Sequence, residues 1–393
     1  MELLRVAQSP GAPGFVADPF PFYLRLLAAP GPVFWSDLGM VALARRAEID
    51  AVLRSPDFGR ADPSPPSPER GAFADFERHS MLNLDPPAHG RLRAPALRGF
   101  ASSAVAALAP EIEALAHRLI DRFEGGEADL LPAFALPLPL YVTARLLGAP
   151  LSEAPRLLAW SRAVLAVFAH GAGPERREAA DRALADAGRW VGARLAAAEA
   201  APGADLFGRI AAAGAGEGRL SPEEATALVV LLLVAGHEAT AHAILLAVRA
   251  VLEAGIDPAP LFADEAAARR TMEEALRFDP PLHLLVRFAQ ADAEAGGRPI
   301  RCGAPVALLV AAAGRDPEGL AEPDRFDPSR AAAPHLAFGA GPHHCLAAGL
   351  GWLTIRLALK ALFARRPGLR LAGPVRFAPR WHFRAPAAFR VRL

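Results

Sequence analysis

One stretch of the sequence, Ser221 to Glu253, constrains the fold more than any other. Ser221 and Glu224 form a capping box with Pro222 at the first helical position, so we expect a helix to begin here. It would be roughly 50 Å long. From Leu228 to Ala235 it is apolar on nearly all sides, and a helix of that kind has to be buried. The rest of the chain must therefore fold around it.

Small and polar residues interrupt this helix at Ala235-Gly236-His237-Glu238-Ala239-Thr240. Gly236 destabilises a helix interior by about 1 kcal/mol relative to alanine, so something should use the space that it leaves. Two explanations remain open: a flat ligand that lies against the helix, or close packing of a neighbouring helix. An acid, Glu238, and a hydroxyl, Thr240, follow closely.

Cys345 is one of two cysteines and lies in the segment Phe338-Gly339-Ala340-Gly341-Pro342-His343-His344-Cys345-Leu346. The two glycines tolerate positive φ angles, so the backbone can curl around the sulfur and direct amide groups at it. The helical pattern from Ala347 to Arg366 would place the sulfur near a helix N-terminus, which favours a thiolate. A thiolate held in this way is a metal ligand or a nucleophile.

Three interpretations of this cysteine loop compete. A lone cysteine is commonly a small buried apolar residue. A zinc cluster of His335, His343, His344 and Cys345 is the second, but adjacent histidines point in different directions and no second Cys/His pair has the spacing of zinc sites. The third is a haem-thiolate loop, in which one cysteine is the only protein ligand of iron and its sulfur favours cleavage of bound dioxygen.

Composition limits the remaining classes. With 393 residues and 52% hydrophobic content we expect one globular domain over 1–393, without internal repeats or long linkers. The net charge is +1 and Lys360 is the only lysine, so the arginines indicate compositional bias and we expect no nucleic acid partner. Two cysteines cannot form a disulfide framework. The N-terminus resembles neither a signal peptide nor a membrane anchor, and the apolar run Ala225 to Gly236 is short for a bilayer span, so we expect a cytoplasmic protein.

The other patterns predict a mainly α fold with a small β portion. Helices are expected over 18–29, 47–54, most of 87–125 and 136–200, and 271–278; strands are expected over 33–36, 40–44, 282–288 and 298–311, with short pieces over 369–393. The Pro/Ser-rich segment 60–70 is irregular and is a candidate substrate lid. Glu274 and Arg277 lie one turn apart, and docking of their helix on the following strands would bury the pair.

Together these motifs resemble those of the cytochrome P450 family, specifically its soluble bacterial members, over nearly the whole chain. Phe338 to Cys345 fits the pattern F-G-x-G-x-H-x-C, and Glu274 with Arg277 fits E-x-x-R. Ala235 to Thr240 is similar to the central oxygen-binding helix, and Asp85 to Arg93 is similar to D-P-P-x-H-x-R-x-R. The resemblance implies a P450-like haem-thiolate fold that encloses one haem b, iron protoporphyrin IX.

The resemblance also implies roles for individual residues. Cys345 would be the axial ligand of the iron, and Ala235 and Phe338 would contact the haem. The propionates would be held by His89, Arg93, Arg287 and His343. Buried carboxylates need such partners to offset desolvation, and His89 and Arg93 at i and i+4 share one helix face. Glu274 and Arg277, with Arg325, would form a structural ion network behind the cysteine loop.

Two positions depart from the family pattern. Ala239 stands where most members have a threonine directly after the acid, and Thr240 cannot simply replace it because one residue turns a helical side chain by about 100°. Our hypothesis is that Glu238 still relays protons while an ordered water or a substrate hydroxyl replaces the missing group. Ala347 stands where the family usually has glycine, which would place the helix slightly further from the porphyrin.

The resemblance implies a monooxygenase that inserts one oxygen atom from dioxygen into a C–H bond of a hydrophobic small molecule. The expected electron donors are a ferredoxin and its reductase, and the protein is expected to be a monomer. A basic face of Arg98, Arg356, Lys360 and Arg365 would dock the carrier, although a solvated face explains these residues equally well. The alternatives are peroxide-driven, desaturation or coupling chemistry at the same haem, or a haem-binding sensor without enzymatic activity.

Overall fold

The structure is a computed structural model that describes residues 3–63, 70–97, 100–168, 173–201, 203, 205–212, 220–331, 333–380 and 382–393. Its contacts divide the chain into two compact units. The larger unit comprises Met1–Gly59, Pro110–Leu138 and Ala239–Leu393, and the smaller unit comprises Arg60–Ala109 and Pro139–Glu238. The single domain expected over 1–393 stays a prediction.

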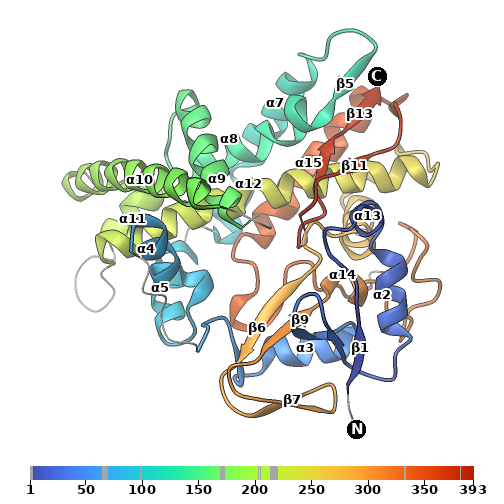
Figure 1. The fold of residues 1–393 in the computed structure, drawn as a ribbon. Helices are drawn as coiled ribbons and strands as arrows, with labels where there is room; N and C mark the ends of the chain where they lie inside the picture. Colours follow the sequence, from blue (N-terminus) through green and yellow to red (C-terminus); the bar gives the residue numbers. More distant parts are fainter. Residues whose placement is uncertain are drawn as a thin grey trace. The chain divides into compact units, whose positions relative to one another are not determined.

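Helices form the smaller unit. Helix α10 (Pro174–Ala200) packs against α9 (Ala154–Val167) and α4 (Ala72–His79), as Figure 1 shows. The carboxylate of Asp181 on α10 accepts a hydrogen bond from the backbone N–H of Phe73 at 2.8 Å, which satisfies an amide at the start of α4. The remaining helices are α5 (Ala88–Leu97), α6 (Ser102–Ala106) and α11 (Leu206–Ala212). Residues 64–69 of the candidate lid lie outside the described residues.

Three of the described helices have residues in both units. They are α7 (Ala109–Ile120), of which only Ala109 belongs to the smaller unit, α8 (Pro137–Leu146) and the long helix α12 (Pro222–Glu253). The capping box at the start of α12 is confirmed: the Glu224 N–H donates to Ser221 Oγ at 3.2 Å, and the Ser221 N–H donates to Glu224 Oε2 at 2.9 Å. Two orphan donors are thereby satisfied at the N-terminus of the helix.

Helix α12 is also long and apolar enough to cross a membrane by length and composition, with a window of mean hydropathy 1.8. The argument that this apolar run is too short for a bilayer is therefore wrong. Burial separates the two possibilities, because 67% of that window is buried inside the protein. The expectation of a buried core helix is confirmed.

The larger unit contains the β structure and the remaining helices. Its helices are α1 (Pro13–Ala17), α2 (Phe20–Leu27), α3 (Arg46–Arg54), α7 (Ala109–Ile120), α13 (Glu265–Phe278), α14 (Val310–Ala313) and α15 (Ala348–Arg365). A six-stranded sheet has the order β1-β2-β3-β9-β6-β4, in which β1 pairs with β2 and β3 with β9 in parallel and the other neighbours are antiparallel. Its strands are β1 (Leu4–Val6), β2 (Val33–Trp35), β3 (Met40–Leu43), β4 (Phe58–Gly59), β6 (Leu285–Ala289) and β9 (Pro305–Leu308).

Smaller sheets complete the β portion. Strands β7 (Ala293–Ala295) and β8 (Arg298–Ile300) form a hairpin; β10 (Arg370–Leu371), β13 (Arg390–Arg392) and β5 (Glu127–Asp129) form a three-stranded sheet; β11 (Arg376–Phe377) pairs with β12 (Pro386–Ala388). The single strand expected over 298–311 is wrong. The chain turns at Gly303, whose φ is +82°, and ends as the helical turn α14. Glycine allows that left-handed turn, and the alanines of α14 favour helix over strand.

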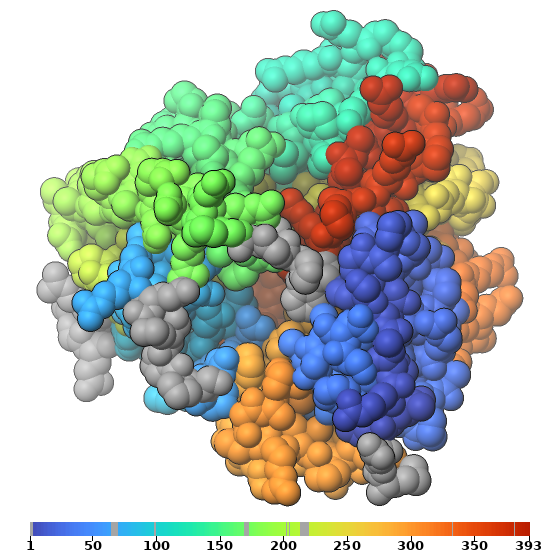
Figure 2. All heavy atoms as spheres, viewed as in Figure 1, coloured from blue at the N-terminus to red at the C-terminus, as the bar shows by residue number. Residues whose placement is uncertain are grey.

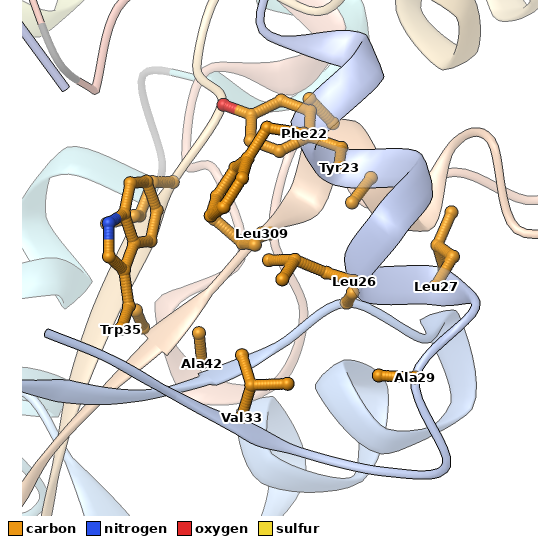
Figure 3. Close-up of a cluster of buried hydrophobic side chains, with 14 of the residues drawn as sticks. Phe22, Tyr23, Leu26, Leu27, Ala29, Val33, Trp35, Ala42 and Leu309 are labelled. Atoms are coloured by element: carbon orange, nitrogen blue, oxygen red, sulfur yellow. The ribbon is translucent and has the colours of Figure 1, made fainter. Parts of the chain in front are cut away.

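An apolar cluster joins α2 to the sheet of the larger unit (Figure 3). Phe22, Leu26, Val33 and Trp35 are each at most 4% exposed. The Trp35 indole N–H donates to the Gln8 carbonyl at 2.7 Å, so its one polar atom is satisfied. On the surface, Figure 2 shows the N-terminal residues in blue against the C-terminal segment in red.

Candidate active site

The cysteine loop folds as its glycines predict. Gly339 and Gly341 have φ angles of +68° and +67°, in the left-handed region that favours glycine. A 3-10 turn, η6 (Gly341–His343), follows, and the Cys345 N–H donates to the Phe338 carbonyl at 2.9 Å. Cys345 is half-buried and is not part of a disulfide. Helix α15 starts three residues later, which confirms the expected helix after the sulfur.

Gly341 is fixed by a close approach to another part of the larger unit. A Cβ on Gly341 would lie 2.1 Å from the carbonyl oxygen of Leu53 at the end of α3, whereas the nearest atom to one on Gly339 would be 3.8 Å away. Leu53 belongs to a buried apolar cluster that also contains Leu336 and Ala340. The loop is therefore anchored on α3 through a contact that only glycine allows.

Ala347, the second departure from the family pattern, lies in the cap of α15 with φ −96° and ψ 17°. These angles need no glycine, so alanine fits the backbone here without strain. The effect of Ala347 on the distance between the helix and a porphyrin stays a prediction.

The Glu274–Arg277 pair on α13 is buried, as expected, with side chains 4% and 1% exposed. Two hydrogen bonds of 2.7 and 2.8 Å join the guanidinium to the carboxylate. Arg277 also donates to the carbonyls of Gly314 at 2.5 Å, Pro323 at 2.8 Å and Arg325 at 3.1 Å. A buried ion pair is stable only when its remaining hydrogen-bonding groups also have partners. The three carbonyls are the partners of the remaining guanidinium N–H groups.

The place of Arg325 in this network was predicted wrongly. Its guanidinium is 63% exposed and contacts Glu322 at 3.3 Å, and only its backbone carbonyl meets Arg277. The second cation is Arg330, whose Nε lies 3.4 Å from Glu274 Oε1 and whose other nitrogens bind the carbonyls of Ala321 and Glu322. Both arginines lie in one irregular turn, so their order in the sequence does not indicate which one turns inward.

Ala235 is exposed in the middle of α12, although the residues over 227–233 and 241–248 are buried. The space next to Gly236 is used differently. A Cβ on Gly236 would lie 2.9 Å from Oγ1 and 3.4 Å from Cγ2 of Thr143, a buried residue of α8. Of the two explanations for Gly236, close helix packing is therefore the one that this contact supports. A flat ligand remains expected at Ala235, the neighbouring and exposed position.

Thr240 directs its hydroxyl towards α15. A Cβ on Gly351 of that helix would lie 4.0 Å from Thr240 Oγ1 and 4.0 Å from Phe338 Cε1. Ala239 lies about 100° around α12 from Thr240 and shares a face with Ala235, which precedes it by one turn. This geometry agrees with the expectation that Thr240 does not take the place of the missing hydroxyl. The catalytic roles of Glu238 and Thr240 stay predictions.

The four expected propionate partners are distributed over both units. In the smaller unit, His89 is 4% exposed and Arg93 follows it by one turn on α5. Burial lowers the pKa of His89, the Arg93 guanidinium lowers it further, and Asp85 opposes both. Asp85 itself accepts hydrogen bonds from the backbone N–H groups of Arg60 and Ala61 at 2.9 Å.

In the larger unit, Arg287 lies on β6 and is 4% exposed, and its Nη1 donates to the Val286 carbonyl at 3.0 Å. His343 is half-buried in η6, two residues before Cys345. The structure thus brings His343, Phe338 and Cys345 together in one loop.

The zinc interpretation of the cysteine loop receives no support. Within the described parts of the chain, no group of three or more His, Cys, Asp or Glu side chains is arranged to hold a metal ion. His335 instead binds Glu273 at 2.9 Å. A single thiol in a structured loop and buried cationic side chains are the donor set that suits a haem with carboxylate substituents.

Comparison with known proteins points in the same direction. The Cytochrome P450 family model matches residues 268–365. Nocardicin C N-oxygenase from Nocardia uniformis subsp. tsuyamanensis is 35% identical over 346 residues, 86% of this chain and 84% of that protein. Cytochrome P450 monooxygenase PikC from Streptomyces venezuelae is 34% identical over 368 residues, 91% of this chain and 86% of that protein.

The crystal structure of CalO2 superposes with a TM-score of 0.91 at 30% identity and covers 98% of both chains. The relatives are bacterial monooxygenases and hydroxylases by name. The mainly α fold with its small β portion, the cysteine loop and the identity to these relatives lead to one conclusion: the chain belongs to the cytochrome P450 family, whose members bind haem b, and is a monooxygenase.

Proposed function

We propose that this monooxygenase holds its haem through Cys345 and uses electrons from a ferredoxin to oxidise a hydrophobic small molecule. The observation that carries the proposal is the cysteine loop, in which two left-handed glycines and the Gly341–Leu53 approach hold a single thiol three residues before α15. The start of that helix favours negative charge on the sulfur. When bound, a thiolate-ligated haem supplies the activation of dioxygen.

The chain's own contribution is to bind and orient the cofactor. His89, Arg93, Arg287 and His343 would hold the propionates, because these carboxylates need cationic or N–H partners once they leave water. Ala235, exposed on α12, and Phe338, in the cysteine loop, would contact the haem. The Glu274–Arg277–Arg330 cluster stabilises the segments that precede this loop.

Proton delivery would depend on Glu238. Ala239 has no hydroxyl and Thr240 faces α15, so an ordered water or a substrate hydroxyl would complete the path. The test is Ala239→Thr with the native substrate. We expect it to change both the product rate and the share of electrons lost to peroxide, and no change in either would refute this part of the proposal.

The substrate class rests on apolar side chains. By resemblance, Leu231 and Leu232 on α12 and Leu282 before β6 would line the pocket, and their apolar side chains suit a hydrophobic compound. The names of two relatives broaden the reaction: nocardicin C N-oxygenase is named for oxygenation at nitrogen, and another is a mycinamicin IV hydroxylase/epoxidase. C–H hydroxylation is our first proposal, and product mass with NMR would separate it from oxidation at nitrogen, epoxidation, desaturation and coupling.

Three of the basic residues expected to dock the electron carrier are paired with acidic side chains, which reduces the positive charge of this face. Arg356 pairs with Glu265 at 2.6 Å, Arg365 with Asp121 at 2.6 Å and Lys360 with Glu113 at 3.9 Å, while Arg98 lies outside the described residues. A ferredoxin that docks there would have to compete with these acids. Ferredoxin reduction kinetics that do not change with salt would count against this face.

The decisive experiment is the absorption spectrum of the reduced protein with carbon monoxide. Thiolate ligation predicts the strongly red-shifted Soret band in the wild type and its loss in Cys345→Ala. A band that persists in the variant would overturn the ligand assignment. Turnover with peroxide but not with ferredoxin and reductase would select the peroxide-driven alternative.

A further inference from the structure

A chain of three buried polar side chains lies in the larger unit, away from the cysteine loop. Tyr23 on α2 shares a hydrogen bond with His283 Nδ1 at 3.2 Å, and His283 Nε2 lies 3.1 Å from Asp279 Oδ1. The three residues are 1%, 3% and 5% exposed. With the carboxylate as acceptor at Nε2, a neutral His283 accepts from the Tyr23 hydroxyl at Nδ1. Every polar atom of the imidazole is then satisfied.

Asp279 connects this Tyr23–His283–Asp279 chain to two arginines. Its Oδ2 lies 3.4 Å from Nη1 of Arg249 on α12 and 3.7 Å from Nε of Arg384 near the C-terminus. Arg384 donates to the carbonyls of Val16 and Ala17 at 2.7 and 2.8 Å. The carboxylate at the end of α13 therefore connects α12 to the C-terminal segment, which in turn holds α1.

The backbone on both sides of His283 is paired with the C-terminal segment. The His283 N–H donates to the His382 carbonyl at 3.0 Å, the Arg384 N–H donates to the Pro281 carbonyl at 2.8 Å, and Leu282 forms a β-bridge with Phe383. We call these two paired pieces, 281–284 and 382–384, the paired wall. Its position depends on the polar chain, because His283 belongs to both and Arg384 of the wall contacts Asp279 of the chain.

The paired wall packs against the face of α12 that carries Ala235. The Phe383 ring lies edge-on to His242 with 6.4 Å between centroids. His242 follows Ala235 by seven residues, which is close to two full turns, and follows Glu238 by four. The paired wall thus lies next to the face of α12 that, under the proposed function, contacts the haem and the substrate.

We propose that Tyr23, His283 and Asp279 are positioning residues. They hold the paired wall in the arrangement that faces the substrate, and they do so from the side opposite the substrate. The inference rests on the proposed function, because it requires that the face of α12 with Ala235 and His242 lines the substrate site. Buried polar groups of this kind are often replaceable by well-packed apolar side chains without loss of stability. A fully satisfied polar chain instead holds its members in one arrangement.

Acid should disturb this arrangement. Burial lowers the pKa of His283; Asp279 opposes this effect, and Arg384 and Arg315 add to it. The groups that face His283 or its partner are Tyr23 from α2, Asp279 from α13, Arg249 from α12, Arg384 from the C-terminal segment and Arg315 after α14. A proton on His283 would add a third cation next to Asp279, and its Nδ1 could no longer accept from Tyr23.

The test compares a bulky and a small ligand of the haem iron, econazole and imidazole, in the holoenzyme. The variants are Tyr23→Phe and His283→Asn, and the matched control is Tyr141→Phe on α8, because Tyr141 is the only other tyrosine. Both variants lose the Tyr23–His283 hydrogen bond, which should weaken econazole binding by about three- to tenfold. Imidazole affinity and the carbon monoxide spectrum should stay within about twofold of the wild type.

A pH series separates positioning from general destabilisation. Both probes contain an imidazole that is itself protonated in this pH range, so the readout is the difference between the proteins. Econazole affinity should fall more steeply below the usual histidine pKa of 6.5 in the wild type than in the His283→Asn protein. Econazole binding that is unchanged in Tyr23→Phe, or imidazole binding that is weakened equally, would overturn the inference. If His283→Asn does not fold, the comparison of Tyr23→Phe with Tyr141→Phe still tests the inference. Failure of the proposed function would appear earlier, as a wild-type protein without the red-shifted carbon monoxide band.

Discussion

At the scale of single residues, the cysteine loop depends on two glycines that are needed for different reasons. Gly339 needs only its left-handed backbone, since a Cβ would meet its first neighbour at 3.8 Å. Gly341 needs the same backbone and also the absence of a side chain, since a Cβ would overlap the Leu53 carbonyl at 2.1 Å. Backbone conformation alone restricts Gly339 to glycine, whereas Gly341 is restricted both by backbone conformation and by the space available for a side chain.

We therefore expect Gly341→Ala to convert most of the carbon monoxide complex from the strongly red-shifted band to a shorter-wavelength form, because the loop must move away from α3. Gly339→Ala should cost only about 1–2 kcal/mol of backbone strain and keep that band. Absorption spectra and thermal unfolding of the two holoproteins measure the difference. Equal spectra in the two variants would show that the Leu53 contact does not hold the loop.

Gly236 offers a second prediction, in the smaller unit. Gly236→Ala should lower the free energy of unfolding by about 1–3 kcal/mol, because its Cβ would lie 2.9 Å from Oγ1 of Thr143, whose branched side chain cannot easily turn away. In a Thr143→Ala background the nearest remaining atom is Cβ at 3.7 Å, an ordinary contact. There the same substitution should stabilise by up to about 1 kcal/mol through helix propensity.

Urea unfolding of the four proteins of this double-mutant cycle measures the change of sign. If Gly236→Ala is equally destabilising in both backgrounds, the space next to Gly236 is needed for something other than Thr143. In that case a ligand at this glycine would again become the better explanation.

At the scale of elements, ion pairs and hydrogen bonds join helix α13 to the turn over 322–330. Only some of the side chains involved are those expected from the sequence. Arg277 is surrounded by Glu274 and three carbonyls, and Arg330 closes the cluster from the turn. Arg325 contributes only its backbone. Two arginines five residues apart therefore have different roles: the Arg330 side chain is 13% exposed and meets Glu274, whereas that of Arg325 is 63% exposed.

We expect Arg330→Ala to lower the free energy of unfolding by about 0.5–1.5 kcal/mol, because it removes the hydrogen bonds to the Ala321 and Glu322 carbonyls and the contact with Glu274. Arg325→Ala is the matched control and should change stability by less than about 0.5 kcal/mol. Denaturant unfolding of both holoproteins, with haem retention as a second readout, checks the difference. A larger effect for Arg325→Ala would restore the original assignment.

At the scale of the whole molecule, acid stability should report on the Tyr23–His283–Asp279 chain. The folded-state pKa of His283 lies below 6.5, so below this pH the unfolded chain binds more protons and the folded state loses stability as the pH falls. The folded-state pKa of Asp279 lies below 3.8: burial opposes this shift, but the His283 hydrogen bond, Arg384 and Arg249 outweigh it. Asp279 thus stabilises the fold above pH 3.8, and this contribution is lost in stronger acid.

The urea midpoint of the wild type should therefore fall as the pH decreases from 6.5. His283→Asn should show a shallower decrease over the same range, because its side chain does not titrate. His89, whose pKa is also lowered, contributes in the same direction to both proteins, so the difference between the two slopes isolates His283. Parallel slopes would mean that His283 does not couple folding to pH.

The sequence alone determined the features whose signals are local. The capping box of α12, the two left-handed glycines before Cys345 and the i, i+3 pair Glu274–Arg277 each depend on residues within a few positions of one another. Short-range geometry and helix periodicity control such features, so composition and spacing predict them. The strand expected over 298–311 failed because one glycine turn outweighed an otherwise apolar pattern.

Only the tertiary structure decided which side chains meet across the chain. Tyr23 and His283 are separated by 260 positions in the sequence, and Gly341 needs to be glycine because of the carbonyl of Leu53. Arg330 rather than Arg325 reaches Glu274 because of how an irregular turn packs on α13. Such contacts are selected by packing between distant segments, and the residues next to each partner carry no signal of it.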